Sequence, residues 1–299
     1  MRAVVAVLVL LLAGCGVATG RGPGVVVTTD ILGDVTRRVV GDQAEVTVLM
    51  RAGADPHSFG VSARQAALLE RAELVVHNGL GLEEGVLRHV EAAADAGVPT
   101  LAAGEAAGPL PYASGDRAGR PDPHVWTDPR RMIRVVDAVA ARVVAEVDGV
   151  DAAKVRANAA AYRAELEALD AWIERRLASV PADRRALVTD HHVFGYFAAR
   201  YGFRVVGAVV PSGTALASPS ASDLASLAGA IRAARVPAVF VGVSQPDRLA
   251  RVLASETGIG VRVVALRTES LGPPGQDAAT YTGLMRANAA AVADALTPR

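Results

Sequence analysis

This sequence of 299 residues has a single cysteine, no formal net charge and few long apolar runs. Cys15 is the single cysteine, which excludes an internal disulfide, an iron–sulfur cluster and a cysteine-based zinc finger. Basic residues number 31 and acidic residues 31, so no overall field attracts the protein to nucleic acid or to an anionic membrane surface. What is present is a chain with 51% hydrophobic residues, enough for one large domain or two ordinary ones.

The N-terminus has the layout of a secretory leader. A positively charged start precedes an apolar run over 3–13, which is too short to span a membrane, and small residues follow. The tetrapeptide LAGC ending at Cys15 matches the bacterial lipobox, which predicts lipidation of Cys15 after removal of residues 1–14 as a lipoprotein signal peptide. The Gly-rich residues 15–24 are then expected to form a flexible tether that anchors the protein to the outer face of the cell membrane. The alternatives are a soluble signal peptide with an incidental cysteine and a short membrane anchor.

Strand-like and helix-like segments alternate at the start of the folded chain. Apolar runs of strand length alternate with helical patterns over 31–40 and 83–94. Such alternation is typical of a parallel sheet covered by helices on both faces, and it predicts an N-terminal α/β lobe over 25–150. The Gly- and Pro-rich residues 103–123 lack any period and are predicted as a long loop. The predicted strands cover residues 25–29, 44–50, 74–76 and 98–102.

Two long helical patterns follow, over 129–147 and 152–180. At 1.5 Å per residue the second would reach about 43 Å, which is more than one small domain needs. We therefore predict that residues 151–180 form a backbone helix linking two lobes. Beyond it the alternation resumes and predicts a C-terminal α/β lobe over 181–299. Its predicted strands cover residues 185–189, 204–210, 238–243 and 261–266, and its last helix residues 280–296.

Three of the six histidines lie where a strand pattern ends or a loop begins: His57, His124 and His191. Ligands of open α/β sheets bind beyond the carboxyl ends of the strands, so this placement suits a binding site. Singly, each histidine could be a solvent-facing or capping residue, but the three together favour a histidine–carboxylate site for a borderline divalent cation. A nearby preceding aspartate can accept a hydrogen bond from each ring and orient it. These aspartates are Asp55, Asp122 and Asp190.

Several longer motifs occur in a fixed order along the chain. In the first half they are GADPH ending at His57, AELVVHNG ending at Gly79 and DPHVWTDP around His124. In the second half they are HHVFGYF from His191, SETG ending at Gly258, TESLG around Glu269, TY at Thr280 and MRAN ending at Asn288. As a set, these motifs resemble those of the zinc- and manganese-binding solute-binding proteins of bacterial ABC importers, over nearly the whole chain after the leader.

The resemblance implies a metal site and an architecture. The family's ligands fall on His57, His124, His191 and Glu269, the last at a position where aspartate is more usual. The implied fold has two α/β lobes joined by a long backbone helix, with two ligands from each lobe and the metal in the cleft between them. The implied partner is an ABC permease with its cytoplasmic ATPase, and the implied hinge motion on binding is small.

Three features depart from the family pattern. The loop over 103–123 contains no histidine, which argues against metal scavenging by this loop. His192 stands where an acidic residue is often found, so coordination by His192 in place of His191 is an alternative, and the register against 194–197 favours His191. Gly242 stands where a glutamate often ends the strand, which removes any electrostatic role from that position.

The other histidines and two aromatic residues receive different assignments. His77 lies at a strand end and is interpreted as structural, and His89 is interpreted as a solvent-facing helix residue. Trp126 and Tyr196 are expected to pack around the site and control solvent access without ligating the metal.

Three imidazoles and one carboxylate suit Zn²⁺, with Mn²⁺ as the next choice, and four protein ligands leave no position for an activated water. We therefore predict a carrier and not an enzyme, a monomer that captures the metal outside the cytoplasm and delivers it to the permease. Two other classes remain open at this point. A secreted metal-dependent hydrolase would use three histidines and a bound water, although the chain has no His-Glu-x-x-His motif. A surface adhesin-type lipoprotein is the other, although no adhesive motif is visible.

Overall fold

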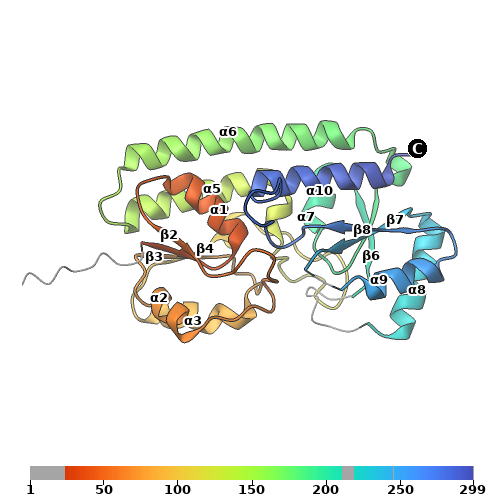
Figure 1. Cartoon of the computed structure of the whole chain (residues 1–299), viewed down its shortest axis with the longest axis horizontal. Helices are drawn as coiled ribbons and strands as arrows, with labels where there is room; N and C mark the ends of the chain where they lie inside the picture. Colours follow the sequence, from red (N-terminus) through yellow and green to blue (C-terminus); the bar gives the residue numbers. More distant parts are fainter. Residues whose placement is uncertain (1–23, 211–218, 245, 299) are drawn as a thin grey trace, which may run out of the picture.

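The computed structural model describes residues 24–210, 219–244 and 246–298. The predicted signal peptide, the predicted lipidation site Cys15 and all of the predicted tether except Gly24 lie outside the described residues. No helix in the described part of the chain combines the length and the apolar character that crossing a membrane requires. Two parallel sheets of four strands each form the centres of two lobes (Figure 1).

The N-terminal sheet has the strand order β2-β1-β3-β4. Alternate side chains of β1 point to opposite faces, because successive residues of a strand do so. Val25 and Val27 pack under α1 and α5, whereas Val26 packs against α2 and α3. The elements are β1 (Val25–Val27), α1 (Asp30–Val40), β2 (Val46–Val48), α2 (Ala63–Leu69), β3 (Leu74–His77), α3 (Glu84–Asp95), β4 (Thr100–Ala102), α4 (Ala103–Ala106) and α5 (Pro129–Glu146).

The C-terminal sheet repeats this layering, with the order β6-β5-β7-β8. Leu187 and Phe240 face α7 and α10, whereas Val188 and Val239 face α8 and α9. The elements are β5 (Ala186–Thr189), α7 (Gly195–Tyr201), β6 (Arg204–Ala208), α8 (Ala221–Ala234), β7 (Ala238–Gly242), α9 (Arg248–Glu256), β8 (Arg262–Leu266) and α10 (Tyr281–Leu296).

Helix α6 (Ala152–Leu177) runs along both lobes (Figure 1). Its 26 residues make it about 39 Å long at 1.5 Å per residue. The Asp151 side chain caps its start by accepting the backbone N–H of Ala153 at 2.9 Å. Helix α6 packs against α1 and α5 at one end and α10 at the other, so one continuous apolar core passes beneath it from lobe to lobe. The apolar stripe that predicted this helix is buried along its whole length: Val155, Ala159, Tyr162, Leu166, Leu169, Ile173 and Leu177.

Several predicted strands are shorter in the structure, and the predictions differ more clearly from it in two places. The predicted loop over 103–123 begins with the short helix α4 and contains an antiparallel bridge between Pro111 and Pro121. Helix α2 was not predicted, because its seven residues are too few to show a clear period. The signal that could have found it is the capping box at its start, in which Ser62 accepts the backbone N–H of Gln65 and the Gln65 side chain accepts that of Ser62.

Candidate metal centre

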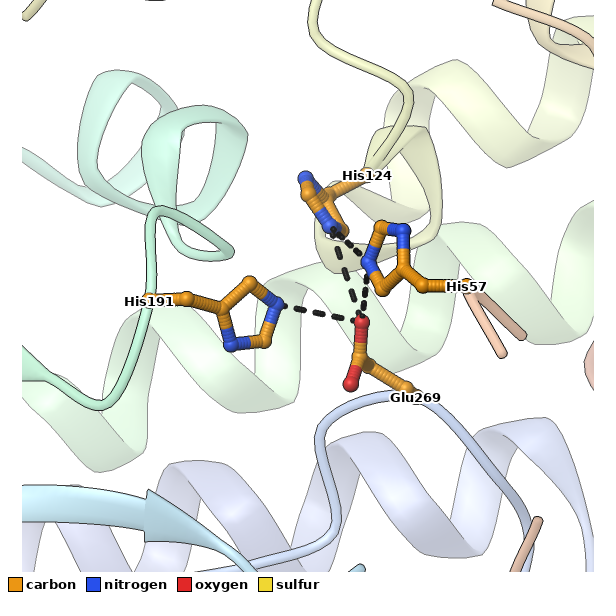
Figure 2. A group of neighbouring side chains, drawn as sticks. All are labelled: His57, His124, His191 and Glu269. Carbon is orange, nitrogen blue, oxygen red and sulfur yellow. Dashed lines mark hydrogen bonds and ion pairs between the residues drawn. The ribbon is translucent and has the colours of Figure 1, made fainter. Parts of the chain in front are cut away.

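The carboxyl ends of strands from both sheets lead into the segments that carry the candidate site. His57 follows β2, His191 comes two residues after β5, and Glu269 comes three residues after β8. His124 directly precedes the short 3₁₀ turn Val125–Thr127 that leads into α5. Two residues therefore come from each lobe. One nitrogen from each imidazole and one oxygen of Glu269 all lie within 4.8 Å of one another (Figure 2).

The spacing of these four atoms suits a single small cation. Glu269 Oε1 lies 2.8 Å from His57 Nε2, 3.1 Å from His191 Nε2 and 3.7 Å from His124 Nε2. The Nε2 atoms of His57 and His124 are 3.3 Å apart. Ligand atoms about 2.05 Å from a tetrahedral Zn²⁺ would stand about 3.3 Å from one another. The observed separations are distributed around this value, so an ion can enter with small shifts of the side chains.

Two aspartates orient two of the three imidazoles, those of His124 and His191, from the far side of each ring. Asp122 Oδ1 lies 2.7 Å from His124 Nδ1 and accepts the backbone N–H of His124 at 3.0 Å. Asp190 Oδ1 lies 3.0 Å from His191 Nδ1 and accepts the backbone N–H of His191 at 2.8 Å. A carboxylate at Nδ1 favours a proton on that nitrogen and leaves the Nε2 lone pair directed into the cluster. Asp55 accepts the backbone N–H of His57 at 2.8 Å and so fixes the turn that carries this histidine.

The cluster is closed to solvent and polarised. His124 and His191 are 0% exposed, and Glu269 is 2% exposed. Burial disfavours charge on His191, but the Glu269 and Asp190 carboxylates outweigh it and hold the pKa of His191 well above its usual value. Burial likewise opposes charge on His124, and the Asp122 carboxylate leads the effects that raise its pKa. For Glu269 the three imidazoles outweigh burial and hold the carboxyl pKa well below its usual value.

One oxygen of the cluster has no hydrogen-bond partner in the described part of the chain. Glu269 Oε2 is buried and unpaired, although a buried carboxylate oxygen normally accepts at least one hydrogen bond. In Figure 2 it is the oxygen of Glu269 that carries no dashed line. Buried acceptors facing one another with few donors among them are the arrangement that a bound cation stabilises.

Two aromatic side chains lie beside the candidate ligands, as expected for Trp126 and Tyr196. The Trp126 ring stands edge-on to His124 with ring centroids 5.3 Å apart, and its Nε1 donates to the carbonyl of Thr268 at 2.7 Å. The Tyr196 hydroxyl donates to the carbonyl of Asp122 at 2.5 Å. Both bonds join the two lobes directly behind a candidate ligand.

The remaining histidines are not part of the four-residue group. His77 ends β3, where burial lowers its pKa, and His89 is half-buried on α3. His192 is half-buried beside His191 and contributes no atom to the group, which favours the register with His191.

The environment of Gly242 explains one departure from the family pattern. Its backbone N–H donates to Asp190 Oδ2 at 2.6 Å, so Asp190 is held by the strand as well as by His191. A Cβ atom at Gly242 would lie 2.6 Å from Thr268 Oγ1 and 3.0 Å from Asp190 Oδ2. These contacts leave no room for a glutamate side chain in this arrangement. Sequence reasoning missed this link because the two residues are 52 positions apart.

Comparison with known proteins agrees with this site and fold. The zinc-binding protein TroA of Treponema pallidum is 30% identical over 92% of this chain and 89% of its own length. Its solved structure matches with a TM-score of 0.83 at 28% identity, over 92% of this chain and 99% of that one, which confirms the predicted architecture.

Relatives named for other metals also match over most of this chain. The manganese-binding lipoprotein MntA of Halalkalibacterium halodurans is 28% identical over 95% of this chain and 94% of its own length. The iron-binding protein YfeA of Yersinia pestis is 30% identical over 78% and 74%. The family model for zinc-uptake complex component A, periplasmic, matches residues 25–295. Because that match includes both lobes, the helix between them and all four clustered residues, the chain belongs to this family of metal-binding proteins.

Proposed function

We propose that this protein captures a divalent transition metal outside the cytoplasm and delivers it to an ABC permease with its ATPase for import. His57, His124, His191 and Glu269 are the ligands in this proposal. The observations that carry it are the buried group of four ligand atoms within 4.8 Å of one another and the buried Glu269 Oε2, which has no hydrogen-bond partner among the described residues. The family relationship supports the transport role, because relatives are named as substrate-binding lipoproteins of metal ABC transporters.

Zinc is the proposed cargo, with manganese next. Three imidazoles and one carboxylate suit Zn²⁺, whereas Mn²⁺ favours sites richer in oxygen ligands. The relatives are named for manganese, zinc and iron, so membership of the family is compatible with each of these metals.

The proposal includes no catalysis. A hydrolytic zinc site keeps one position for water, whereas four protein ligands fill a tetrahedral shell. Cobalt substitution tests this, because Co²⁺ with four protein ligands gives an absorption spectrum that added anions do not change. An anion-sensitive spectrum would indicate an open position and favour the hydrolase.

The proposed mature protein is a lipid-anchored monomer. Residues 1–14 are removed, Cys15 carries the lipid, and 15–24 tether a lobe over 25–150, a helix over 151–180 and a lobe over 181–299. Support comes from relatives named as lipoproteins. Replacing Cys15 by serine should release the protein from the membrane fraction, and retention of the Cys15→Ser variant in that fraction would contradict the lipid anchor.

Elemental analysis of protein purified without added metal tests the main proposal. We expect about one equivalent of zinc per chain, because each chain offers one four-ligand site. Competition with manganese then ranks the two metals at the same site. A protein that binds neither metal in titrations at neutral pH would refute the proposed function.

A further inference from the structure

The segment that follows Glu269 is tied to the opposite lobe by a single carboxylate. Asp30, the first residue of α1 in the N-terminal lobe, accepts two hydrogen bonds at Oδ2. One comes from the Ser270 hydroxyl at 2.5 Å and the other from the backbone N–H of Leu271 at 2.9 Å. The two residues after the candidate ligand are therefore held by a group 240 positions away in the sequence.

The same serine also reaches the segment that carries His57. The backbone N–H of Gly53 donates to Ser270 Oγ at 2.6 Å. Gly53 lies four residues before His57, on the loop after β2. The Ser270 hydroxyl thus accepts from one loop and donates to Asp30, and it fixes the position of the Glu269 loop relative to the His57 loop.

Burial makes this contact depend on closure of the cleft. Asp30 is 7% exposed and Ser270 is 5% exposed. The two hydrogen bonds with the shortest distances at the Asp30 carboxylate, from Ser270 and Leu271, come from the other lobe, and the backbone N–H groups of Ile31 and Asp30 stabilise it from its own helix. Removing a carboxylate from water is unfavourable unless hydrogen bonds replace the lost hydration. The Ser270 and Leu271 donors supply their part of this compensation only while the Glu269 loop rests against α1.

We propose that Asp30 and Ser270 form an interlobe latch, two positioning residues that hold Glu269 against the three imidazoles and slow the release of bound metal. The inference rests on the proposed function, because it assigns a role to residues around that metal site. Neither residue belongs to the group of four proposed ligands. Each acts through the backbone that presents the Glu269 carboxylate.

Asp34 provides a matched control on the same helix. It lies one turn after Asp30, and its Oδ2 accepts the backbone N–H of Tyr281 at 2.9 Å, again from the other lobe. Tyr281 is 12 residues beyond Glu269, at the start of α10. Asp34→Asn therefore weakens a contact between the lobes without loosening the Glu269 loop.

The first test is the rate of zinc release from the full protein into excess chelator, followed by absorbance. We expect Asp30→Asn and Ser270→Ala each to raise the rate about tenfold, which corresponds to about 1.4 kcal/mol. Asp34→Asn should change it by less than about threefold. An unchanged rate in both latch variants, or an equal rise in Asp34→Asn, would overturn the proposal.

The second test separates positioning of Glu269 from general weakening of the fold. If Asp30 acts through Glu269, adding Asp30→Asn to a Glu269→Ala variant produces no further loss of zinc affinity, because coupled residues are not additive. A full tenfold loss in that background would contradict the latch. In Asp30→Asn alone, the visible absorption of bound Co²⁺ should weaken as water replaces the displaced carboxylate, and an unaltered spectrum would count against it. Wild-type protein that binds no zinc would instead refute the proposed function.

Discussion

At the scale of single residues, the short distances between Glu269 and the imidazoles call for a shared proton in the cluster when no metal is bound. Glu269 Oε1 is within 3.1 Å of two imidazole Nε2 atoms, and at least one of these nitrogens must carry a proton for that contact to be favourable. The raised pKa of His191 and the lowered pKa of Glu269 describe the same imidazolium–carboxylate pair from its two sides. Metal binding therefore replaces a proton as well as water.

Metal affinity should fall as the pH falls, and the fall should begin above the ordinary histidine pKa of about 6.5. The reason is that the pKa of His124 and His191 is raised, so protons compete with the metal at a higher pH than an isolated imidazole would allow. Calorimetric zinc titrations at pH 5.0, 6.5 and 7.5 check this. Equal affinity at the two extremes would contradict the site assignment.

The same shifts give the metal-free protein an opposite dependence on pH. The contribution of His191 to stability is fully present below 6.5, the unshifted pKa, and is lost as the pH rises through the higher folded-state pKa. We expect the rise in Tm on adding zinc to be larger at pH 8 than at pH 6. Thermal denaturation with and without zinc measures it, and a rise that shrinks with increasing pH would argue against a protonated cluster.

Replacing a proposed ligand should be far more damaging than replacing another buried histidine. His57→Ala, His124→Ala and His191→Ala should each weaken zinc binding by about 100-fold or more, since even groups that only orient a ligand contribute about 10- to 100-fold. His77→Ala is the matched control, because His77 lies in the same lobe as two of them, away from the cluster. Competition titrations measure all four, and His77→Ala as the most damaging would show that the assigned register is wrong.

At the scale of elements, α6 does more than span the distance between the lobes. Its residue Asp170 is 1% exposed and accepts hydrogen bonds from residues of both lobes. Arg130 Nε of α5 donates at 2.7 Å, Arg200 Nη2 of α7 at 2.6 Å and the Tyr201 hydroxyl at 3.0 Å. Burial opposes the charge on Asp170, but these donors lower its pKa below the usual value. One carboxylate on the connecting helix thus fixes an arginine from each lobe.

Removing this carboxylate should destabilise the protein strongly. Asp170→Ala leaves two arginines without their partner, and we expect the free energy of unfolding to fall by about 3 kcal/mol. The control is Asp137→Ala, which breaks the exposed ion pair between Asp137 of α5 and Arg163 of α6. This change should have little effect on the free energy of unfolding. Denaturant titrations compare the two variants. Equal losses of stability would mean that the buried Asp170 contributes no more to stability than an exposed ion pair.

At the scale of the whole molecule, the two lobes share one core. The largest apolar cluster includes Val27 of the first sheet, Leu166 of α6 and Phe240 of the second sheet without a break. Such continuity opposes wide separation of the lobes, because opening would expose packed apolar surface at about 25 cal/mol per Å². The packing therefore supports the small hinge motion implied by the resemblance.

We expect the metal-free protein to unfold in one cooperative transition, because a shared core couples the lobes. Scanning calorimetry checks this by comparing the calorimetric and van't Hoff enthalpies. Two separate transitions in the absence of metal would show that the lobes are independent and that the core beneath α6 contributes little to their coupling.

The sequence by itself determined the local periodic structure and, through its motifs, the family. The strand and helix patterns and the stripe from Val155 to Leu177 are visible because side-chain direction repeats every two or 3.6 residues. The seven residues of α2 are too few for such a repeat to be visible. The strand predicted over 44–50 is only Val46–Val48 in the structure, because β1 has three residues with which it can pair.

Only the tertiary structure decided which side chains meet. Equal spacings of 67 residues between His57, His124 and His191 carry no information about the distance between their rings. The same holds for Asp190 with Gly242 and for Asp30 with Ser270, which are 52 and 240 positions apart. The physical reason is that contacts across a cleft depend on how two sheets are positioned by α6 and their shared core, and no local pattern records that arrangement.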